Sequence, residues 1–599
     1  MSALATSRPA RARPDWIRLW PIVPALLFLA VFFLYPVAQL LWLSAVDRAG
    51  ALTATHYTRL FESALYFRVL KITFEIAAWT TLFSIVFGYP VAYYLATSSA
   101  RKRNTLMLWV LLPFWTSFLV RTFAWIVLLG RNGAINKWLQ ALGITDAPVA
   151  LIYNFAGTMI GMTHAMMPLA IMTMVSVMEN IDANLPRAAS TLGARGGQAF
   201  WRIYFPLSLP GVAAAGLLVF ITALGFFITP QLLGGRTETM ITQIIITQIQ
   251  EMMNWSFGGA VAMLLLVTAL LVFYLYDRAL GMSTLAGGAT TTQGEGKRNP
   301  IAAFGAWAGG HLLDLIGRAC DAVAIAYEKI VPPRPDKPRR ERSRLTLAGA
   351  ALLIIFFLAA PTFFIVPVSF TTDAFIEWPP KFFSLRWYEA FFSSSIWISA
   401  AVRSLVVATI AAALAMLVGA PAAFVLVRQR MMGKTAAMAF ILSPLIIPRI
   451  IIAIALFYFY ARLGLVGSSV GLILGHAILA VPYVVVTVMA VLKTYDERLD
   501  QAAGSLGANR AQTLWHITFP LIRTGLIAAF LFAFITSLDE LTIALFVSGG
   551  VATTLPKQMW DDALLKVNPT LAAVSTLLLV FVTAMILIAE FLRRRAAGR

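Results

Sequence analysis

The chain has 599 residues, of which 60% are hydrophobic and only 12% are charged. Soluble proteins carry about 25% charged residues, so this composition excludes an ordinary soluble protein, and the apolar content excludes a disordered chain. The net charge of +20 comes from short basic clusters between long apolar runs, which is typical of membrane proteins and not of nucleic-acid-binding proteins. A single cysteine, Cys320, excludes a disulfide framework, and with only five scattered histidines we expect no metal site.

Twelve apolar runs approach or exceed the roughly 20 residues needed to cross a bilayer. In chain order they lie near 19–43, 69–97, 105–130, 153–178, 207–234, 258–280, 345–370, 398–427, 435–462, 470–493, 521–548 and 570–592. The first run is too long for a signal peptide and has no convincing cleavage site, so we expect it to be retained. Every second connection is basic, as in Arg101, Lys102 and Arg103, which predicts that both termini are cytoplasmic. The predicted fold class is an all-α integral membrane protein with about 12 transmembrane helices.

The two halves of the chain repeat each other. NLPRAASTLGARGGQAFWRIYFPLSLPG (184–211) matches RLDQAAGSLGANRAQTLWHITFPLIRTG (498–525), with an offset of 498 − 184 = 314. Upstream, Gly88 matches Gly419 with an offset of 419 − 88 = 331, so the first half is longer by 17 residues, which we place around 131–155. The repeats have the same orientation, which predicts two parallel six-helix repeats related by an axis along the membrane normal.

The repeats define three regions: a first six-span domain (1–282), a cytoplasmic linker (283–343) and a second six-span domain (344–599). The linker opens with a Gly- and Thr-rich stretch and closes with PPRPDKPRRERSR, both typical of flexible connections. Between them, residues 301–331 mix apolar and charged side chains. A spanning helix there would upset the topology. Of an interfacial helix and a partly helical tether, we favour the tether.

The connection between the fourth and fifth spans of each half is long and patterned. A helix-forming segment with an alanine pair is interrupted by a glycine, which tolerates a left-handed or a tightly packed backbone. A second amphipathic segment follows, and a proline is predicted to end it and to start the next span. The landmark residues are Ala188, Ala189, Gly193, Phe200 and Pro206 in the first half, and Ala502, Ala503, Gly507, Trp515 and Pro520 in the second. We predict a helix–turn–helix that exposes aromatic side chains and arginines to a soluble partner.

This doubled pattern resembles the signature loop of type I ABC importer permeases. The family pattern begins with Glu, whereas this sequence has Pro186 and Asp500-Gln501 near that point. The resemblance implies that each loop is a coupling helix for one copy of a cytoplasmic ABC ATPase subunit, two copies in all. An ordinary amphipathic connector is the alternative.

Further segments are similar to a fused pair of polyamine (spermidine/putrescine)-type transmembrane subunits. WTSFLVRTFAWIVLLGRNGAIN (115–136) and ALGFFITPQLLGG (223–235) carry the likeness in the first half, and SLDELTIALFVSGG (537–550) in the second. The resemblance implies a bacterial inner-membrane importer for a small, amine-bearing solute delivered by a periplasmic solute-binding protein. Relatives also serve opines and aminoethylphosphonate, so the subfamily narrows the substrate without fixing it.

The chain has no P-loop. Arg428 stands where a P-loop ending at Gly433-Lys434-Thr435 needs its first glycine. We therefore expect a separate ATPase, no enzyme activity and no cofactor in this chain, with membrane lipid and a small-molecule substrate as its other partners and no nucleic acid. A 12-span secondary transporter driven by an ion gradient is the alternative, and a channel or scaffold without active transport is weaker still.

A few ionisable residues lie within the apolar runs, where charge is costly and often functional. Asp539 and Glu540 are expected well inside the eleventh span, where the first half has Gly225 and Phe226, and Arg121 in the third span is their candidate partner across a pathway. Adjacent helical residues point about 100° apart, so at most one of the two acids is expected to line that pathway. The functional interpretation is that these carboxylates attract an amine-bearing substrate or hold a gate. The alternative is a structural salt bridge or a hydrogen bond to the backbone.

Other polar residues and prolines in the runs receive structural interpretations. Lys71 and Glu75 are one turn apart and are expected to pair. His164 and His476 are expected to be hydrogen-bonded packing residues. Six prolines, among them Pro113 and Pro444, are expected to kink their helices.

Overall fold

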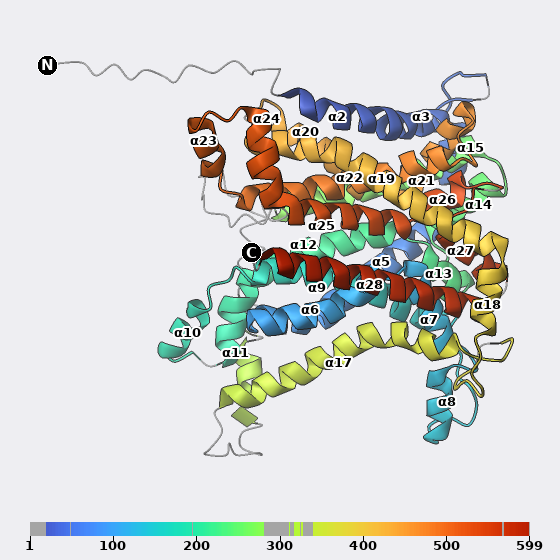
Figure 1. Ribbon diagram of the computed structural model, residues 1–599. Helices are drawn as coiled ribbons and strands as arrows, with labels where there is room; N and C mark the ends of the chain where they lie inside the picture. The colour runs from blue at the N-terminus through green and yellow to red at the C-terminus, as the bar shows by residue number, and fades with distance from the viewer. Residues whose placement is uncertain are drawn as a thin grey trace. The chain divides into compact units, whose positions relative to one another are not determined.

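The computed structural model describes residues 19–597, except 48, 195, 281–310, 312–314, 316, 324, 327–338, 376, 430, 551 and 566–567. The described residues are mainly helical, and their extended pairings are two isolated bridges, Val46 with Leu52 and Thr371 with Phe383. Eleven helices are long and apolar enough to cross a membrane, and one bent helix pair makes up to twelve. The predicted all-α membrane fold is therefore confirmed (Figure 1).

The helices form two compact units. Unit 1 comprises Met1–Trp42, Ser395–Gln558 and Thr583–Arg599, and unit 2 comprises Leu43–Ser394 and Met559–Val582. These units differ from the sequence repeats because each unit combines most of one repeat with the first span of the other.

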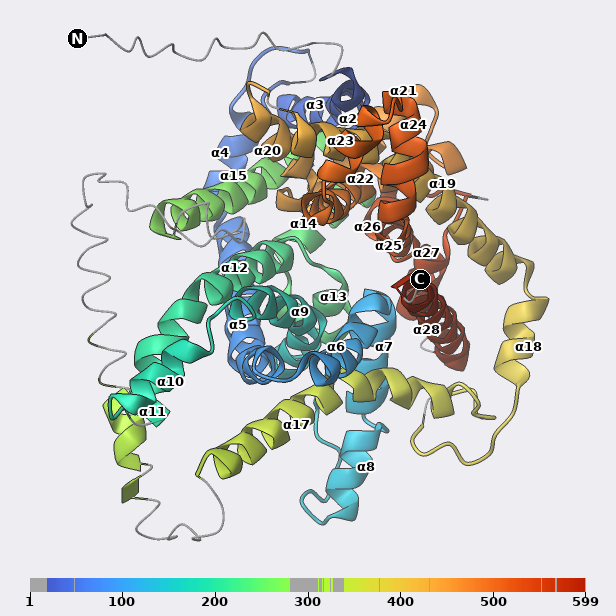
Figure 2. The same cartoon turned by 60° about the vertical axis from the view of Figure 1, so that its left-hand side comes forward.

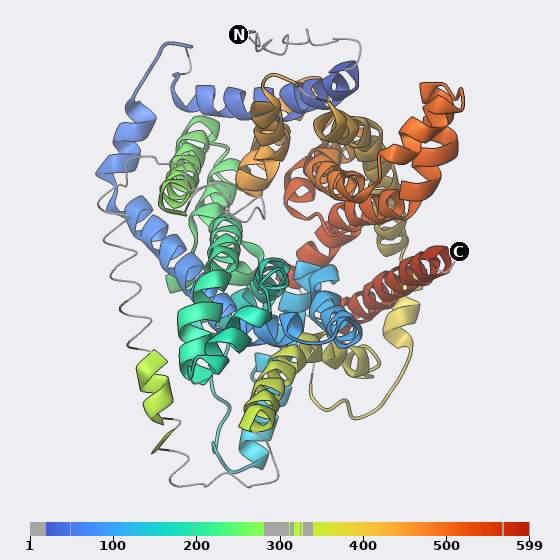
Figure 3. The same cartoon turned by 90° about the vertical axis from the view of Figure 1, so that its left-hand side faces the viewer.

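In unit 1, helices α19, α22 and α25 pack against one another and form the core. The N-terminal helices lie on α19, α20 and α22, and Figure 3 shows them (dark blue) beside the gold helices of this unit. The unit contains η1 (Trp20–Ile22), α2 (Val23–Leu29), η2 (Ala30–Leu34), most of α3 (Tyr35–Ser44), α19 (Ser395–Arg428), α20 (Lys434–Ile446), α21 (Arg449–Leu463), α22 (Ser469–Thr494), α23 (Arg498–Ser505), α24 (Arg510–Thr513), η6 (Leu514–Thr518), α25 (Phe519–Leu538) and α26 (Thr542–Val547).

Unit 2 has an equivalent core of α5, α9 and α12. Helix α17 packs along α5, α6 and α7 (Figure 2). The unit contains α4 (Thr55–Glu62), α5 (Ala64–Ala96), α6 (Ala100–Trp115), α7 (Phe118–Leu129), α8 (Ala134–Ala141), α9 (Phe155–Met178), α10 (Asn184–Thr191), α11 (Gly196–Ala199), η3 (Phe200–Tyr204), α12 (Phe205–Leu224), α13 (Ile228–Leu233), η4 (Arg236–Glu238), α14 (Ile241–Gln250), α15 (Trp255–Leu280), α17 (Arg339–Val368) and α18 (Arg386–Ser393). The last two helices, α27 (Leu555–Leu565) and α28 (Pro569–Ala597), each contribute to both units.

The structure reproduces the sequence repeat residue by residue. Helices α25 and α26 have the same bounds as α12 and α13 shifted by 314 (519 − 205 and 542 − 228). A buried hydrogen bond is repeated as well: the Ile241 amide donates to Thr73 Oγ1 over 2.9 Å, and the Leu555 amide donates to Ser404 Oγ over 2.7 Å. The extra residues of the first half lie between α7 and α9, where α8 is inserted, as the change of offset predicted.

Four expected continuous spans are instead broken. The third run divides into α6 and α7, and the ninth divides into α20 and α21, which meet at 94°. Pro448 explains the second break, because a proline disfavours the helical conformation of the preceding residue, here Ile447, whose ψ is 129°. The fifth and eleventh spans were expected to reach residues 234 and 548, and this was wrong: α12 ends at Leu224 and α25 at Leu538.

Candidate functional site

We call residues 184–204 loop 1 and residues 498–518 loop 2. In loop 1, α10 ends at Thr191 with Leu192 as its C-cap, and the next residue, Gly193, has a φ of +90°. The Gly193 amide donates to the carbonyl of Ser190 (3.2 Å), and the Ala194 amide donates to that of Ala189 (2.9 Å). These two bonds form a Schellman motif, which ends a helix by satisfying its last carbonyls and needs a left-handed residue at this position.

Loop 2 has the same geometry. Gly507 has a φ of +89° and donates to the carbonyl of Gly504 (3.0 Å), and the Ala508 amide donates to that of Ala503 (3.0 Å). Of the two expected alternatives, both glycines have the left-handed backbone, and neither is tightly packed, because no atom lies within 4 Å of an added Cβ. The alanine pairs divide in the same way in both loops, because Ala189 and Ala503 are buried whereas their neighbours Ala188 and Ala502 are exposed.

Among the described residues, the most exposed large apolar side chain of each loop is the leucine before the glycine. Leu192 is 88% exposed and Leu506 is 89% exposed. The sequence interpretation missed both leucines, although their identical place in the two repeats was a usable signal. Repeated exposure of a large apolar side chain on a tight turn suits a protein contact.

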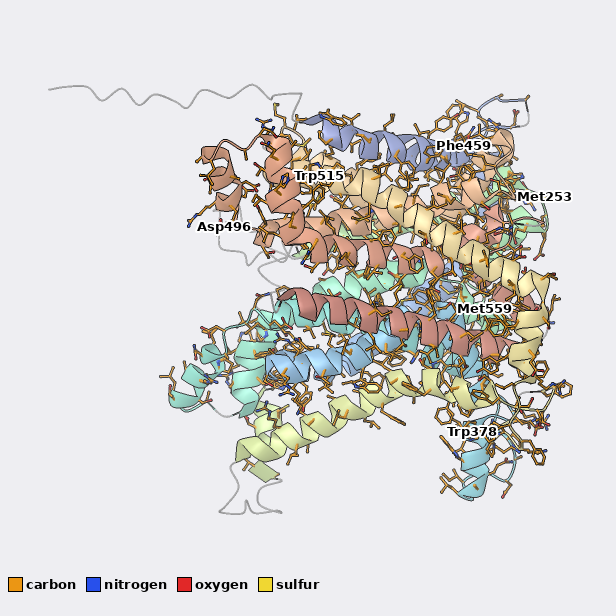
Figure 4. The ribbon with its side chains drawn as sticks, in the orientation of Figure 1. Met253, Trp378, Phe459, Asp496, Trp515 and Met559 are labelled. Atoms are coloured by element: carbon orange, nitrogen blue, oxygen red, sulfur yellow. The ribbon has the colours of Figure 1, made fainter. Side chains whose placement is uncertain are left out.

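The segments after the glycines differ from the prediction in one respect. Helices α11 and α24 continue through the π-helical turns η3 and η6 into the next spans, so Pro206 and Pro520 begin α12 and α25 without ending a helix. A π turn widens the backbone where a proline ring would clash with the carbonyl four residues earlier. Trp515 is 67% exposed, as expected (Figure 4), but Phe200 is partly buried against Tyr93, with ring centroids 5.2 Å apart.

Asp500 ties loop 2 to the ends of two spans. Its carboxylate pairs with Arg428 of α19 (2.7 Å) and accepts hydrogen bonds from the hydroxyls of Tyr495 (2.5 Å) and Thr518 (2.9 Å). Burial and the hydrogen bond to Asp500 raise the pKa of Tyr495 above its ordinary value. Pro186 stands at the equivalent position of loop 1 and cannot make these contacts. Loop 1 is held in part by aromatic packing of Tyr204 on Tyr93, with centroids 4.7 Å apart.

Asp539 and Glu540 lie at the junction of α25 and α26, not inside a continuous span. Glu540 is 1% exposed, and its carboxylate accepts hydrogen bonds from the amides of Thr542 (3.2 Å) and Ile543 (2.7 Å). Glu540 therefore caps α26. Helix α13 begins at the equivalent position of the first repeat with Phe226 in place of the acid, so the break between the helices does not depend on this cap. Asp539 is only partly buried.

Arg449 at the start of α21 was missed by the sequence interpretation. It interacts electrostatically with Tyr483, Glu540 and Asp539. The sequence feature that could have indicated Arg449 is its charge within the apolar run IIPRIIIAIAL (446–456).

Arg121 lies in α7 and is 1% exposed. Its Nη1 donates to the carbonyl of Ala165 (3.1 Å), and its guanidinium lies 4.2 Å from the ring centre of Phe118. Arg121 belongs to unit 2 and the two acids belong to unit 1, so their pairing stays a prediction.

The remaining polar residues behave as predicted. His164 is buried and hydrogen-bonds the carbonyl of Leu358 (2.9 Å), and His476 is buried and hydrogen-bonds the hydroxyl of Ser537 (2.8 Å). Lys71 pairs with Glu75 at 3.6 Å on an exposed face of α5.

Comparison with known proteins identifies the family. The model of the "binding-protein-dependent transport system inner membrane component" family matches residues 84–280 and again residues 415–598. The spermidine/putrescine permease PotB of Escherichia coli is 33% identical over 264 residues, covering 43% of this chain and 96% of PotB. PotC of Haemophilus influenzae is 31% identical, covering 42% of this chain and 98% of PotC. The ferric transport permease FbpB of Actinobacillus pleuropneumoniae is 23% identical over 91% of this chain and 74% of FbpB. The chain therefore belongs to the family of binding-protein-dependent transport system inner membrane components, as a multi-pass ABC importer permease with two fused permease domains.

Proposed function

We propose that this chain supplies both halves of the translocation pathway of an importer for a small amine-bearing solute, a polyamine or a related compound. Two copies of a cytoplasmic ABC ATPase subunit dock on loops 1 and 2, both chain termini lie in the cytoplasm, and a periplasmic solute-binding protein delivers the substrate. The chain itself needs no cofactor.

The repeated loop geometry carries the proposal for the ATPase. Both loops end a short helix with a Schellman motif and expose one leucine at the same position of the repeat. A pair of equal subunits needs two equivalent surfaces, and an ion-driven transporter gives no reason for them. Each leucine would become buried when the ATPase docks and would provide much of the binding energy. The exposed helix around it would provide the shape that the ATPase surface recognises.

The substrate class is supported by two features. Two relatives named for spermidine/putrescine transport cover 43% and 42% of this chain at more than 30% identity, whereas the ferric transport relative is 23% identical. Unit 1 also carries Asp539 and Glu540 at a break between helices, where carboxylates suit a cationic amine.

Leu192→Asp and Leu506→Asp test the docking surfaces. We expect each variant to lower ATPase copurification about ten-fold, because a charge replaces a central apolar contact. The control is Leu142→Asp, which alters a leucine that is 73% exposed but lies outside both loops. Uptake of labelled spermidine into vesicles should require enclosed ATP and persist when ionophores collapse the ion gradients. Normal ATPase association in the double variant, or uptake driven by an ion gradient alone, would contradict the proposal.

A further inference from the structure

The two loops cap their second helix differently. In loop 2, the Asn509 side chain accepts a hydrogen bond from the Gln512 amide (2.9 Å), and the Gln512 side chain accepts one from the Asn509 amide (2.8 Å). This capping box satisfies two amides at the start of α24. The repeat places Arg195 and Gln198 at these positions of loop 1 (509 − 314 and 512 − 314). An arginine side chain has no hydrogen-bond acceptor, so loop 1 lacks the residue that begins the box.

Loop 1 receives its acceptor from the linker between the two repeats. The Gly197 amide, at the second residue of α11, donates to Asp321 Oδ1 over 3.1 Å. Asp321 is 7% exposed and belongs to a helical segment at 317–323, which Figure 2 shows in yellow-green beside α11. Because α11 continues through η3 into α12, this carboxylate lies at the N-terminus of a long helical run, where a negative charge is favourable.

Gly197 provides the room for this contact. A Cβ atom at this position would lie 2.4 Å from Asp321 Oδ1 and 3.1 Å from its Cγ, so a larger residue would displace the carboxylate. Loop 2 has Ala511 at the equivalent position, which shows that the loop itself accepts alanine there. Glycine is therefore needed at position 197 because of the nearby Asp321 carboxylate, and not because of the backbone conformation of the loop.

We propose that the linker segment 317–323 stabilises loop 1. Asp321 replaces the missing cap of α11 and orders the surface on which the first ATPase subunit docks. The ordering of loop 1 is independent of the proposed function, and only its consequence for the ATPase depends on it. Loop 2 carries its own cap, so the fusion linker makes the two docking surfaces chemically unequal.

Hydrogen exchange of the full-length protein, purified without ATPase, tests the contact directly. Asp321→Ala and Gly197→Ala should each speed exchange of the amides in 194–204 about five-fold, the effect of losing one helix cap, and leave 508–518 unchanged. Asp321→Asn keeps an acceptor oxygen and should retain most of the protection. Val323→Ala, at an exposed position of the same segment, is the matched control. Unchanged exchange in both Asp321→Ala and Gly197→Ala would overturn the proposal.

Transfer of the loop 2 cap provides a rescue. Arg195→Asn recreates the Asn509 and Gln512 pair in loop 1, since Gln198 is already present, and should restore protection in the Asp321→Ala background. Failure of this rescue would show that Asp321 does not act as a cap. ATPase copurification, measured on the same variants, separates the two proposals. Faster exchange with normal ATPase binding would support the capping role of Asp321 but contradict the docking role of loop 1.

Discussion

Neighbouring carboxylates at residues 539 and 540 have separate environments because the backbone changes direction between them. Asp539 follows the last residue of α25 and is partly buried, whereas Glu540 is fully buried and accepts two amide hydrogen bonds from the start of α26. The sequence showed that two adjacent acids cannot share one direction. It could not show which of them caps, because the end of α25 depends on tertiary packing.

We predict that Asp539→Asn and Glu540→Gln have different effects. Asp539→Asn should lower amine uptake strongly with little change in thermal stability, because it removes a charge from the more accessible acid. Glu540→Gln keeps one acceptor oxygen but loses the charge that faces Arg449, so it should destabilise the fold by about 1–3 kcal/mol. Thermal unfolding of the purified protein and vesicle uptake, corrected for membrane level, measure the two effects.

Arg449→Gln is the matched control for Glu540→Gln, because it removes the positive charge that interacts with Glu540. It should lower stability as Glu540→Gln does, and the double variant should lose less than the sum of the two single variants. If Asp539→Asn and Glu540→Gln both import at the wild-type rate, these carboxylates no longer support the proposal of an amine-bearing substrate.

At the scale of elements, the sequence predicted loops 1 and 2 well because they depend on local chemistry. A glycine with positive φ after an alanine-rich helix has few alternatives, so Gly193 and Gly507 were found correctly. Features that depend on distant residues were missed. The cap on α11, in which Asp321 accepts a hydrogen bond from the Gly197 amide, joins residues 124 positions apart, and no local pattern indicates it.

Gly193→Pro and Gly507→Pro should each disrupt their loop without preventing membrane insertion. Proline fixes φ near −65°, far from the observed +90° and +89°, and it removes the amide that donates to Ser190 or Gly504. We expect a loss of most ATPase copurification and uptake. Gly504→Ala is the control, because Gly504 lies in α23 with no atom within 4 Å of an added Cβ. It should stabilise the helix by about 0.5–1 kcal/mol. Full activity of the double proline variant would contradict the coupling assignment.

At the scale of the whole molecule, the first span of each repeat belongs to the compact unit that contains most of the other repeat. The N-terminal helices pack in unit 1 with α19 of the second repeat, and α17 packs in unit 2 with α5, α6 and α7 of the first repeat. Hydrophobic runs predicted the number of spans, because that number depends on apolar length alone. They could not predict this exchange, because every span presents a similar apolar surface, and the partner of each span is decided by side-chain packing.

This exchange predicts that the chain can be divided and still assemble. A break within 284–298, which lies outside the described residues, yields one fragment with the N-terminal helices and another with α17. Each fragment then supplies a span that completes the core of the other, so coexpressed halves should insert, copurify and retain uptake. Asp321 stays on the second fragment and should still protect Gly197 on the first. A second fragment that begins at residue 369, and therefore lacks α17, is the matched control and should copurify poorly. If the complete halves insert but remain separate, the covalent linker is required for assembly, and packing of the exchanged spans is too weak to hold the two repeats together.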